Sequence, residues 1–147
     1  MMPHETLKKF GYPEGLIFET MYWATLLRPA QVTLGSMVVI FKGQATRLCD
    51  TTPEAFSEFP VVCERLEEIV KIAFGAQKFN YLALMMVDPH VHFHCIPRYQ
   101  TSVAFGNSYY EDPYWPKPVD ITHTIPMEKN IWAKLLNDMQ LIEKNNR

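Results

Sequence analysis

The chain of 147 residues has little of what several classes of protein require. It holds only three cysteines, Cys49, Cys63 and Cys95, and no Cys-x-x-Cys pair. An odd, widely spaced set argues against a disulfide scaffold or a zinc knuckle and fits reduced thiols in a cytoplasmic protein. The longest apolar runs, such as 37–41 and 81–87, are far shorter than the ~20 residues of a membrane helix. We therefore expect neither a membrane span nor a secreted, disulfide-bonded domain.

An N-terminal signal and an excess of charge of one sign are also missing. The first residues include Lys8 and Lys9 but no apolar stretch, so we expect no secretory signal. Fourteen Lys and Arg against sixteen Asp and Glu give a net charge of −2, which argues against nucleic acid as a partner. Apolar residues make up 48% and charged residues 20%, proportions typical of a folded domain. We expect one domain over residues 1–147.

The first half of the chain predicts strands followed by a long helix. Residues 15–27 are rich in aromatic and apolar side chains and favour a bent strand pair, and residues 36–42 predict a buried strand. Two threonines before Pro53 predict a helix start, and apolar residues at helical spacing continue the pattern to Gly75. Since Pro60 lies inside this pattern, we expect a kink or a short first segment there.

The second half predicts two further strands, a loop and a closing helix. Residues 79–87 and 91–96 read as strands joined by a tight turn at 88–89. Residues 97–126 are rich in proline, glycine and aromatic residues and predict a long irregular loop. Residues 127–143 carry an apolar stripe typical of an amphipathic helix. This order of elements predicts the α+β class with an antiparallel sheet.

Three of the five histidines, His90, His92 and His94, stand at alternate positions. Alternate side chains of a strand share one face, so the three imidazoles are expected to face the same side. Metal binding is one interpretation, because imidazole is a common metal ligand. The outer pair would lie ~13 Å apart at the backbone, too far for one tetrahedral site. Asp88 and His123 are the available outside ligands, and neither has a diagnostic spacing.

Nucleophilic catalysis is the other interpretation of the histidine row. A neutral imidazole attacks phosphorus and also leaves readily, so it divides a phosphoryl or nucleotidyl transfer into two easier steps. Neighbouring imidazoles can donate to the non-bridging oxygens or fix the tautomer of the nucleophile. A row with two-residue spacing suits both tasks.

The segment from His90 to Ile96 resembles the histidine-triad motif of the HIT family, which reads His-apolar-His-apolar-His-apolar-apolar. Pro97 and Arg98, which follow, are similar to the branch of fragile-histidine-triad proteins and dinucleoside polyphosphate hydrolases. The resemblance covers about residues 15–99. It implies a HIT-like α+β fold with a five-stranded antiparallel sheet, one long helix and a C-terminal helix. It also implies a homodimer.

The same resemblance implies a nucleotide hydrolase or nucleotidyl transferase that needs no metal or other cofactor in its chemical step. His92 would attack the α-phosphorus of a phosphoanhydride or phosphoramidate, and water would then cleave the nucleotidyl-histidine. His94 would hydrogen-bond the phosphate oxygens, and His90 would orient the nucleophile. A divergent, non-catalytic nucleotide-binding protein and a metal-binding protein that uses the same row remain the alternatives.

Several pocket residues that the resemblance implies are absent. Ser36 stands where a further histidine is usual, and the turn before the triad lacks a polar phosphate-binding loop. The ribose-binding Asp or Asn is also missing, since the candidate positions hold Leu26 and Arg28. Arg28 is a cation suited to phosphate, although an ordinary surface arginine is the favoured interpretation. We expect His4 to be solvated.

Other residues are candidates for binding the substrate. Arg98 is a permanent cation suited to phosphate. Phe18 and Trp23 would line a purine slot or pack in the core, and Ser36 is the remaining candidate. The aromatic loop at 105–118 is expected to be ordered and to lie against the triad face or a partner subunit, where it would stack on a base or form the interface.

Overall fold

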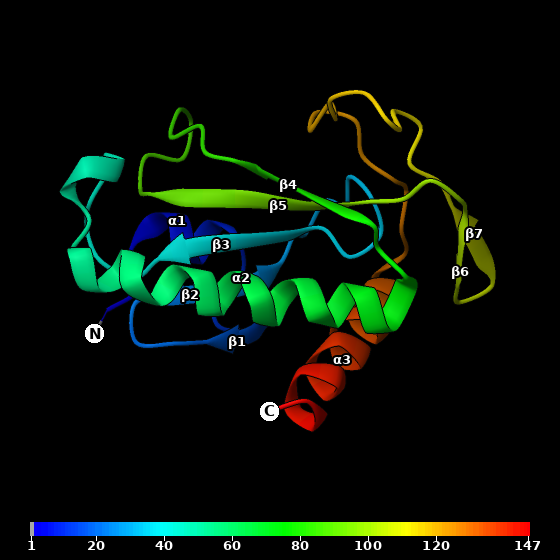
Figure 1. Ribbon diagram of the computed structural model, residues 1–147, viewed down its shortest axis with the longest axis horizontal. Coiled ribbons are helices and arrows are strands. Elements are labelled where there is room, and N and C mark those ends of the chain that lie inside the picture. Colours follow the sequence, from blue (N-terminus) through cyan, green and yellow to red (C-terminus); the bar gives the residue numbers. More distant parts are fainter. Residues whose placement is uncertain (1) are drawn as a thin grey trace.

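A computed structural model describes residues 2–147. The elements in chain order are α1 (Glu5–Lys9), β1 (Leu16–Glu19), β2 (Trp23–Leu27), β3 (Met37–Phe41), the 3-10 helix η1 (Leu48–Asp50), α2 (Pro53–Phe74), β4 (Lys78–Leu82), β5 (His92–Arg98), β6 (Val103–Phe105), β7 (Ser108–Tyr110) and α3 (Lys129–Asn145). Five strands form one antiparallel sheet in the order β1-β2-β3-β5-β4 (Figure 1). The predicted α+β class and five-stranded antiparallel sheet are confirmed.

The sheet buries both of its faces, and different helices cover them. One face contributes Trp23, Leu27 and Val39 to the main core with α2 and α3. The other packs a smaller apolar cluster against Leu7 and Phe10 of α1. Figure 1 shows α2 crossing the near face of the sheet, with α1 behind it. The triad strand β5 therefore lies between the two layers, next to β3.

The long helix α2 is built as its sequence predicts at both ends. The side chain of Thr52 accepts a hydrogen bond from the Ala55 N–H, and Gly75 ends the helix in the left-handed conformation at φ +71°. The expected short first segment is wrong, because the helix continues from Pro53 to Phe74 through Pro60. Pro60 lies on the exposed side of the helix, where the carbonyl that loses its helical donor can be hydrated.

The connection from β4 to β5 differs from the predicted tight hairpin. β4 ends at Leu82, and residues 83–91 form a loop. Val91 bonds elsewhere, because its carbonyl accepts from Phe41 N–H and its N–H donates to Ala45 O. The apolar residues Met86 and Val87 are exposed. The end of the apolar run that suggested a strand is therefore part of the loop.

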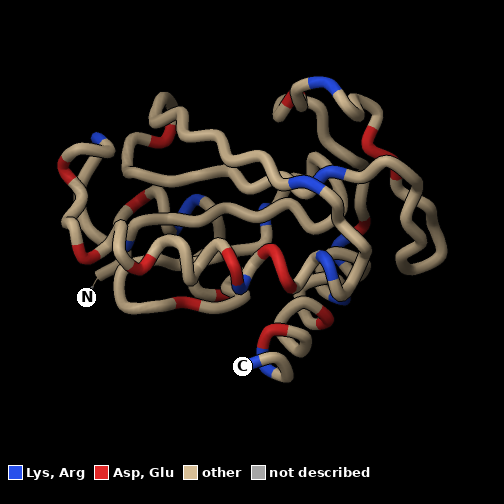
Figure 2. The backbone as a smooth tube through the Cα atoms, viewed as in Figure 1, with Lys and Arg blue, Asp and Glu red and all other residues tan. Residues whose placement is uncertain are grey.

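The C-terminal third is more regular than expected. β6 and β7 form a small hairpin inside the predicted irregular loop, with Gly106 at φ +60° in its turn. The closing helix α3 is present and packs on α2, where Arg65 contacts Glu143. Figure 2 shows positive and negative residues interspersed along the backbone. Within residues 2–147, no helix is long and apolar enough to span a membrane.

Candidate active site

β5 and the residue pair before it bring the three triad histidines together. His94 and His92 are in register with Val38 and Ile40 of β3, on the sheet face that α1 covers. Their ring centroids lie 5.0 Å apart with the rings nearly perpendicular. His90 precedes the strand and is held by α1 rather than by strand pairing. Each ring has its Nδ1 atom engaged by a different partner, and these partners define what each imidazole can do.

The partner of His92 is a carbonyl. Nδ1 of His92 lies 2.6 Å from the backbone oxygen of His90. Because a carbonyl oxygen can only accept, Nδ1 carries the proton, and the neutral ring presents a lone pair at Nε2. Within residues 2–147, Nε2 of His92 makes no hydrogen bond, and it is not among the fully buried atoms that lack a partner. His92 thus keeps an unengaged nucleophilic nitrogen on a ring that is otherwise buried.

The partner of His94 is of the opposite kind. Nε of Arg28 donates to Nδ1 of His94 at 3.3 Å. Since a guanidinium can only donate, Nδ1 of His94 must accept, and Nε2 carries the proton. Burial, then the charges of Arg28 and of the neighbouring His92, lower the pKa of His94 to about 4. His94 is therefore a neutral hydrogen-bond donor beside the lone pair of His92.

His90 is fixed by two residues of the N-terminal segment. Thr6 Oγ1 lies 2.9 Å from Nδ1 of His90, and the His90 N–H donates to the same hydroxyl at 3.4 Å. The His4 ring stacks on the His90 ring with centroids 3.8 Å apart and planes 3° from parallel. His90 is thus clamped by a hydroxyl at its edge and an imidazole on its face.

His4 was expected to be solvated, and this expectation is wrong. Its residue is 7% exposed, Nδ1 accepts from the Leu7 N–H, and Nε2 donates to the Phe41 carbonyl at 2.7 Å. Burial lowers the pKa of His4. A neutral His4 therefore connects α1, β3 and the triad.

The helix α1 also forms a wall beside the reactive rings. The ring centroid of Phe10 lies 5.7 Å from that of His92 and 5.8 Å from that of His94. Nζ of Lys9 lies 2.5 Å from Asp88 in the loop before the triad. The wall is apolar next to the two rings and charged at its outer end.

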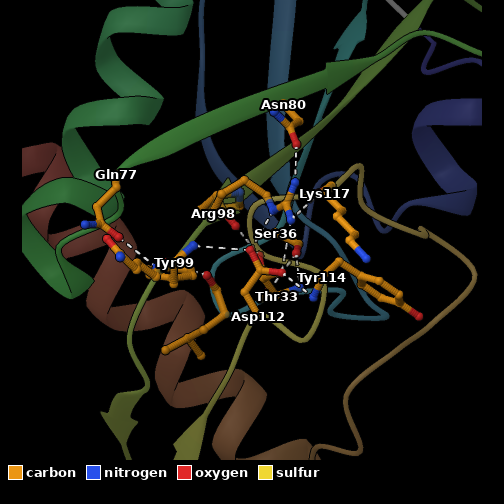
Figure 3. A network of polar contacts seen from close by, with 12 residues as sticks. Thr33, Ser36, Gln77, Asn80, Arg98, Tyr99, Asp112, Tyr114 and Lys117 are labelled. Atoms are coloured by element: carbon orange, nitrogen blue, oxygen red, sulfur yellow. Dashed lines mark hydrogen bonds and ion pairs between the residues drawn. The ribbon is translucent and has the colours of Figure 1, made fainter.

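Arg98 makes its hydrogen bonds with residues other than the triad histidines, and its expected role in phosphate binding stays a prediction. The residue is 4% exposed, and its guanidinium donates to Asp112, to the Asn80 side chain and to the Lys117 carbonyl (Figure 3). These contacts anchor the loop that carries Asp112 to the end of β5. The loop is thus tied beyond the His94 end of the triad strand, and Arg98 has a structural role.

The other candidate binding residues are also placed away from the triad rings. Ser36 is buried, and its Oγ donates to the Thr33 carbonyl and accepts from two backbone N–H groups of the same turn. Phe18 and Trp23 lie in the main core on the opposite sheet face, where Trp23 Nε1 donates to Ala55 O. The structure therefore gives neither aromatic ring a place in a base-binding slot beside the histidines.

The partners that fix the triad tautomers could not be found from the sequence. Thr6 is 84 residues from His90, and Arg28 is 66 residues from His94. Each is a single residue of a common type, so no local motif marks it. The one available signal was the departure at position 28, where a cation replaces the acid or amide of the resembled family.

The geometry around His92 and His94 disfavours the alternative interpretation of the histidine row as a metal site. Within residues 2–147, no group of three or more His, Cys, Asp or Glu side chains is arranged to hold a metal ion. The bond from Arg28 occupies Nδ1 of His94, and the carbonyl bond occupies Nδ1 of His92. Only the Nε2 atoms of these two rings could then bind an ion, and the two rings are nearly perpendicular to each other.

The low pKa of His94 predicts that stability depends on pH. The pKa is about 4 in the folded protein and 6.5 in its ordinary state, so the unfolded chain binds more protons between these values. We expect the free energy of unfolding to fall by on the order of 2–3 kcal/mol from pH 6.5 to pH 4 through this group. Urea unfolding across this range checks it. His94→Gln should have a shallower pH slope, and equal slopes would contradict the prediction.

Comparisons with known proteins agree with this architecture. The model of the HIT domain family matches residues 12–101, whereas no curated protein matches the sequence. A histidine triad protein from Marinobacter aquaeolei VT8 shares 21% identity, with 98% of this chain and 96% of that chain covered and a TM-score of 0.73. A hypothetical histidine triad nucleotide-binding protein from Sulfolobus tokodaii strain7 shares 20% identity over 89% of this chain and 84% of that chain, with a TM-score of 0.66.

A more divergent structure has the same fold. The diadenosine triphosphate hydrolase of Plasmodium falciparum shares 13% identity over 95% of this chain and 92% of that chain, with a TM-score of 0.62. At these identities the likenesses show the fold, whereas the family match extends over more than half of the chain and includes the complete histidine row. The chain belongs to the HIT domain family.

Proposed function

We propose that the protein is a nucleotide hydrolase or nucleotidyl transferase that cleaves a phosphoanhydride or phosphoramidate bond through a covalent intermediate on His92. One observation carries this proposal: the Nδ1 atoms of His92 and His94 have partners of opposite kinds. His92 therefore presents a lone pair and His94 an N–H, on rings 5.0 Å apart. A nucleophile beside a donor for phosphate oxygens is the pair that nucleotidyl transfer requires.

The two steps follow from this pair. Nε2 of His92 attacks the α-phosphorus, a P–N bond forms, and the bond to the leaving group breaks with its electron pair on that group. The Nε2–H of His94 donates to a non-bridging oxygen as charge develops there. Water then attacks the same phosphorus, loses a proton, and releases the nucleoside monophosphate and neutral His92. An acceptor other than water would make the second step a transfer.

The charges around the site favour a phosphate. Lys9 compensates Asp88, whereas Arg28 has no carboxylate within 4.0 Å among the described residues. A net positive site attracts and orients a phosphate anion.

Substrate panels test the proposal directly. The purified protein is incubated with adenosine and guanosine phosphoramidates and with dinucleoside tri- and tetraphosphates, with and without a chelator, and release of mononucleotide is measured. We expect release from at least one substrate, at a rate unchanged by the chelator. Absence of release from every substrate, or loss of activity on chelation, would reject the proposal.

A non-catalytic nucleotide-binding protein is the second candidate. The observation in its favour is that the His92 residue is only 2% exposed, with Phe10 packed beside its ring. Such a protein would bind nucleotides without releasing a product and without forming an adduct. Calorimetry together with the substrate panel separates the two functions.

The clamp on His90 leads to a prediction about α1. Replacing Thr6 with valine preserves its volume but removes the hydroxyl bonded to Nδ1 and N of His90. We expect kcat to fall by about fivefold, because a hydrogen bond of about 1 kcal/mol then no longer orients the ring. Thr6→Ser, which keeps the hydroxyl, should retain most activity. Equal rates for the valine and serine variants would show that the hydroxyl does not act on the site.

We also propose a cytoplasmic homodimer. The three cysteines are free, which suits a reducing compartment. β4 pairs only with β5 among the described strands, so its outer edge is available to a second copy. On α2, Val61 is exposed and available to a partner, whereas Val62, Leu66 and Ile69 lie in the core. Light scattering at micromolar concentration should give twice the chain mass, and a monomer mass would contradict this prediction.

A further inference from the structure

Arg28 differs from every other arginine of the chain in lacking an acidic partner. Among the described residues, each of the other four arginines lies within 4.0 Å of a carboxylate: Arg47, Arg65, Arg98 and Arg147. Arg28 instead follows β2 directly and extends across the triad face to His94. Contrary to expectation, it is partly buried. Burial lowers the pKa of Arg28, and the nearby Asp88, which is itself ion-paired with Lys9, raises it only in part. A bound anion would offset the remaining cost of burying this cation.

The guanidinium is held in place but is not saturated. Its Nε donates to His94 at 3.3 Å, and Nη1 donates to the Ala30 carbonyl at 2.7 Å. Nη2 has no acceptor within residues 2–147, and it is not among the fully buried atoms that lack a partner. A planar fork with a fixed orientation and free donors matches the geometry of a phosphate oxyanion.

The geometry of His94 separates this fork from the reacting phosphate. Arg28 binds Nδ1 of His94, whereas the N–H that would contact the reacting phosphate is on Nε2. These two atoms point in widely different directions from the ring. The fork is thus one side chain removed from the nucleophile, beside the site but not at the attacked phosphorus.

We propose that Arg28 binds a second phosphate group of the substrate, distinct from the one that His92 attacks, and makes the site selective for nucleotides with at least two phosphates. The identity of the ligand as a nucleotide rests on the proposed function. The second phosphate can belong to the phosphate chain or to the ribose, and both offer the same oxyanion to the fork.

Matched pairs of ligands test this role. Calorimetry at fixed ionic strength compares AMP with ADP, whose second phosphate is in the chain, and with adenosine 3′,5′-bisphosphate, whose second phosphate is on the ribose. The guanosine counterparts are measured in the same way. The protein is examined as wild type, Arg28→Gln, Arg28→Lys and the control Arg47→Gln, in which the same charge is removed from an exposed side chain.

The decisive quantity is the affinity for the nucleotide with two phosphates divided by the affinity for the corresponding monophosphate. We expect this ratio to be about tenfold or more for one of the two pairs in wild type and in Arg47→Gln. It should fall to near one in Arg28→Gln and to an intermediate value in Arg28→Lys, which keeps the charge but loses the fork. Damage to the fold would weaken both members of a pair equally and leave the ratio unchanged.

Each outcome has a defined meaning. A wild-type ratio near one, or a ratio unchanged by Arg28→Gln, would overturn the role of Arg28 even if the protein hydrolyses nucleotides. A ratio that depends on Arg28 without turnover supports this role and rejects the catalytic proposal. If none of these nucleotides binds, both the role of Arg28 and the proposed function are overturned. The pair that shows the preference identifies the position of the second phosphate.

Discussion

Replacing His92 with alanine is expected to abolish turnover, lowering kcat by roughly 10⁴-fold or more. His92 is the ring whose Nδ1 is committed to a carbonyl, which leaves the lone pair on Nε2. Neither neighbour can replace it. Nε2 of His94 carries a proton because Arg28 donates to the other nitrogen, and His90 lies before β5, where Thr6 and His4 hold its ring.

Formation of the adduct provides a second readout of the same variant. Wild-type protein is mixed with a labelled substrate, and the reaction is quenched without acid because acid would cleave the P–N bond. The protein should gain the mass of one nucleoside monophosphate on His92. His92→Ala should gain none. His92→Asn is a useful companion, because its amide can still donate to the His90 carbonyl while lacking a nucleophilic nitrogen.

A histidine outside the site serves as the control. His123 lies on the C-terminal loop, where its ring contacts Tyr114 with centroids 5.8 Å apart. His123→Ala removes the same imidazole without touching the triad and should retain wild-type turnover. Activity or label that survives in His92→Ala would reject the covalent mechanism.

The fold could be predicted to the extent that local patterns reflect burial. The run at Met37–Phe41 became β3 because all five of its residues are buried between two layers. The start and end of α2 followed from Thr52 and Gly75, whose capping roles depend on nearby backbone atoms only. Such signals are local, so one sequence is enough to read them.

The errors in the fold arose where pairing is decided by distant partners. The apolar residues after Leu82 suggested a longer strand, but the ladder between β4 and β5 ends at the pair of Leu82 and His94. Val91, just before β5, bonds to Phe41 at the end of β3 and to Ala45 beyond it. Apolar content alone therefore did not show where the ladder ends.

The site shows the same division between local and distant information. The histidine row was visible because its spacing is local, and the tautomers of its rings were not. The tautomer of His94 depends on Arg28, and the orientation of the His90 ring depends on Thr6, both of which the topology brings to the row from the end of β2 and from α1. The tautomer of His92 depends on the His90 carbonyl, whose position relative to the ring is set by the backbone before β5. Conversely, Arg98 follows the motif directly yet is bonded to Asp112 rather than directed to the site. Closeness in sequence to the motif therefore does not by itself place a cation beside the reactive rings.

The absence of a histidine at position 36 also has a structural counterpart. Ser36 uses its hydroxyl to close its own turn. The fourth imidazole beside the triad comes from His4, which stacks on His90. Although position 36 holds no histidine, a fourth imidazole therefore lies next to the triad, and it belongs to the N-terminal segment.

Replacing His94 with alanine is expected to lower kcat and kcat/KM together by about 10²–10³-fold. The variant loses the Nε2–H that donates to the phosphate oxygen in the transition state, but it retains the nucleophile. The adduct on His92 should still form, only more slowly. This separates the variant from His92→Ala, in which no adduct forms at any time.

The ranking of the three histidines is the sharpest test of their roles. His90→Ala should be milder than His94→Ala, because His90 is held by Thr6 and His4 and acts by orienting its neighbour. A metal site would instead give comparable losses for any two ligating histidines, with activity sensitive to added ion. Rates measured for the three alanine variants under single-turnover conditions, with and without chelator, distinguish the two. A loss in His90→Ala that equals or exceeds the loss in His94→Ala would contradict the donor role derived for His94 from the bond between Arg28 and its Nδ1.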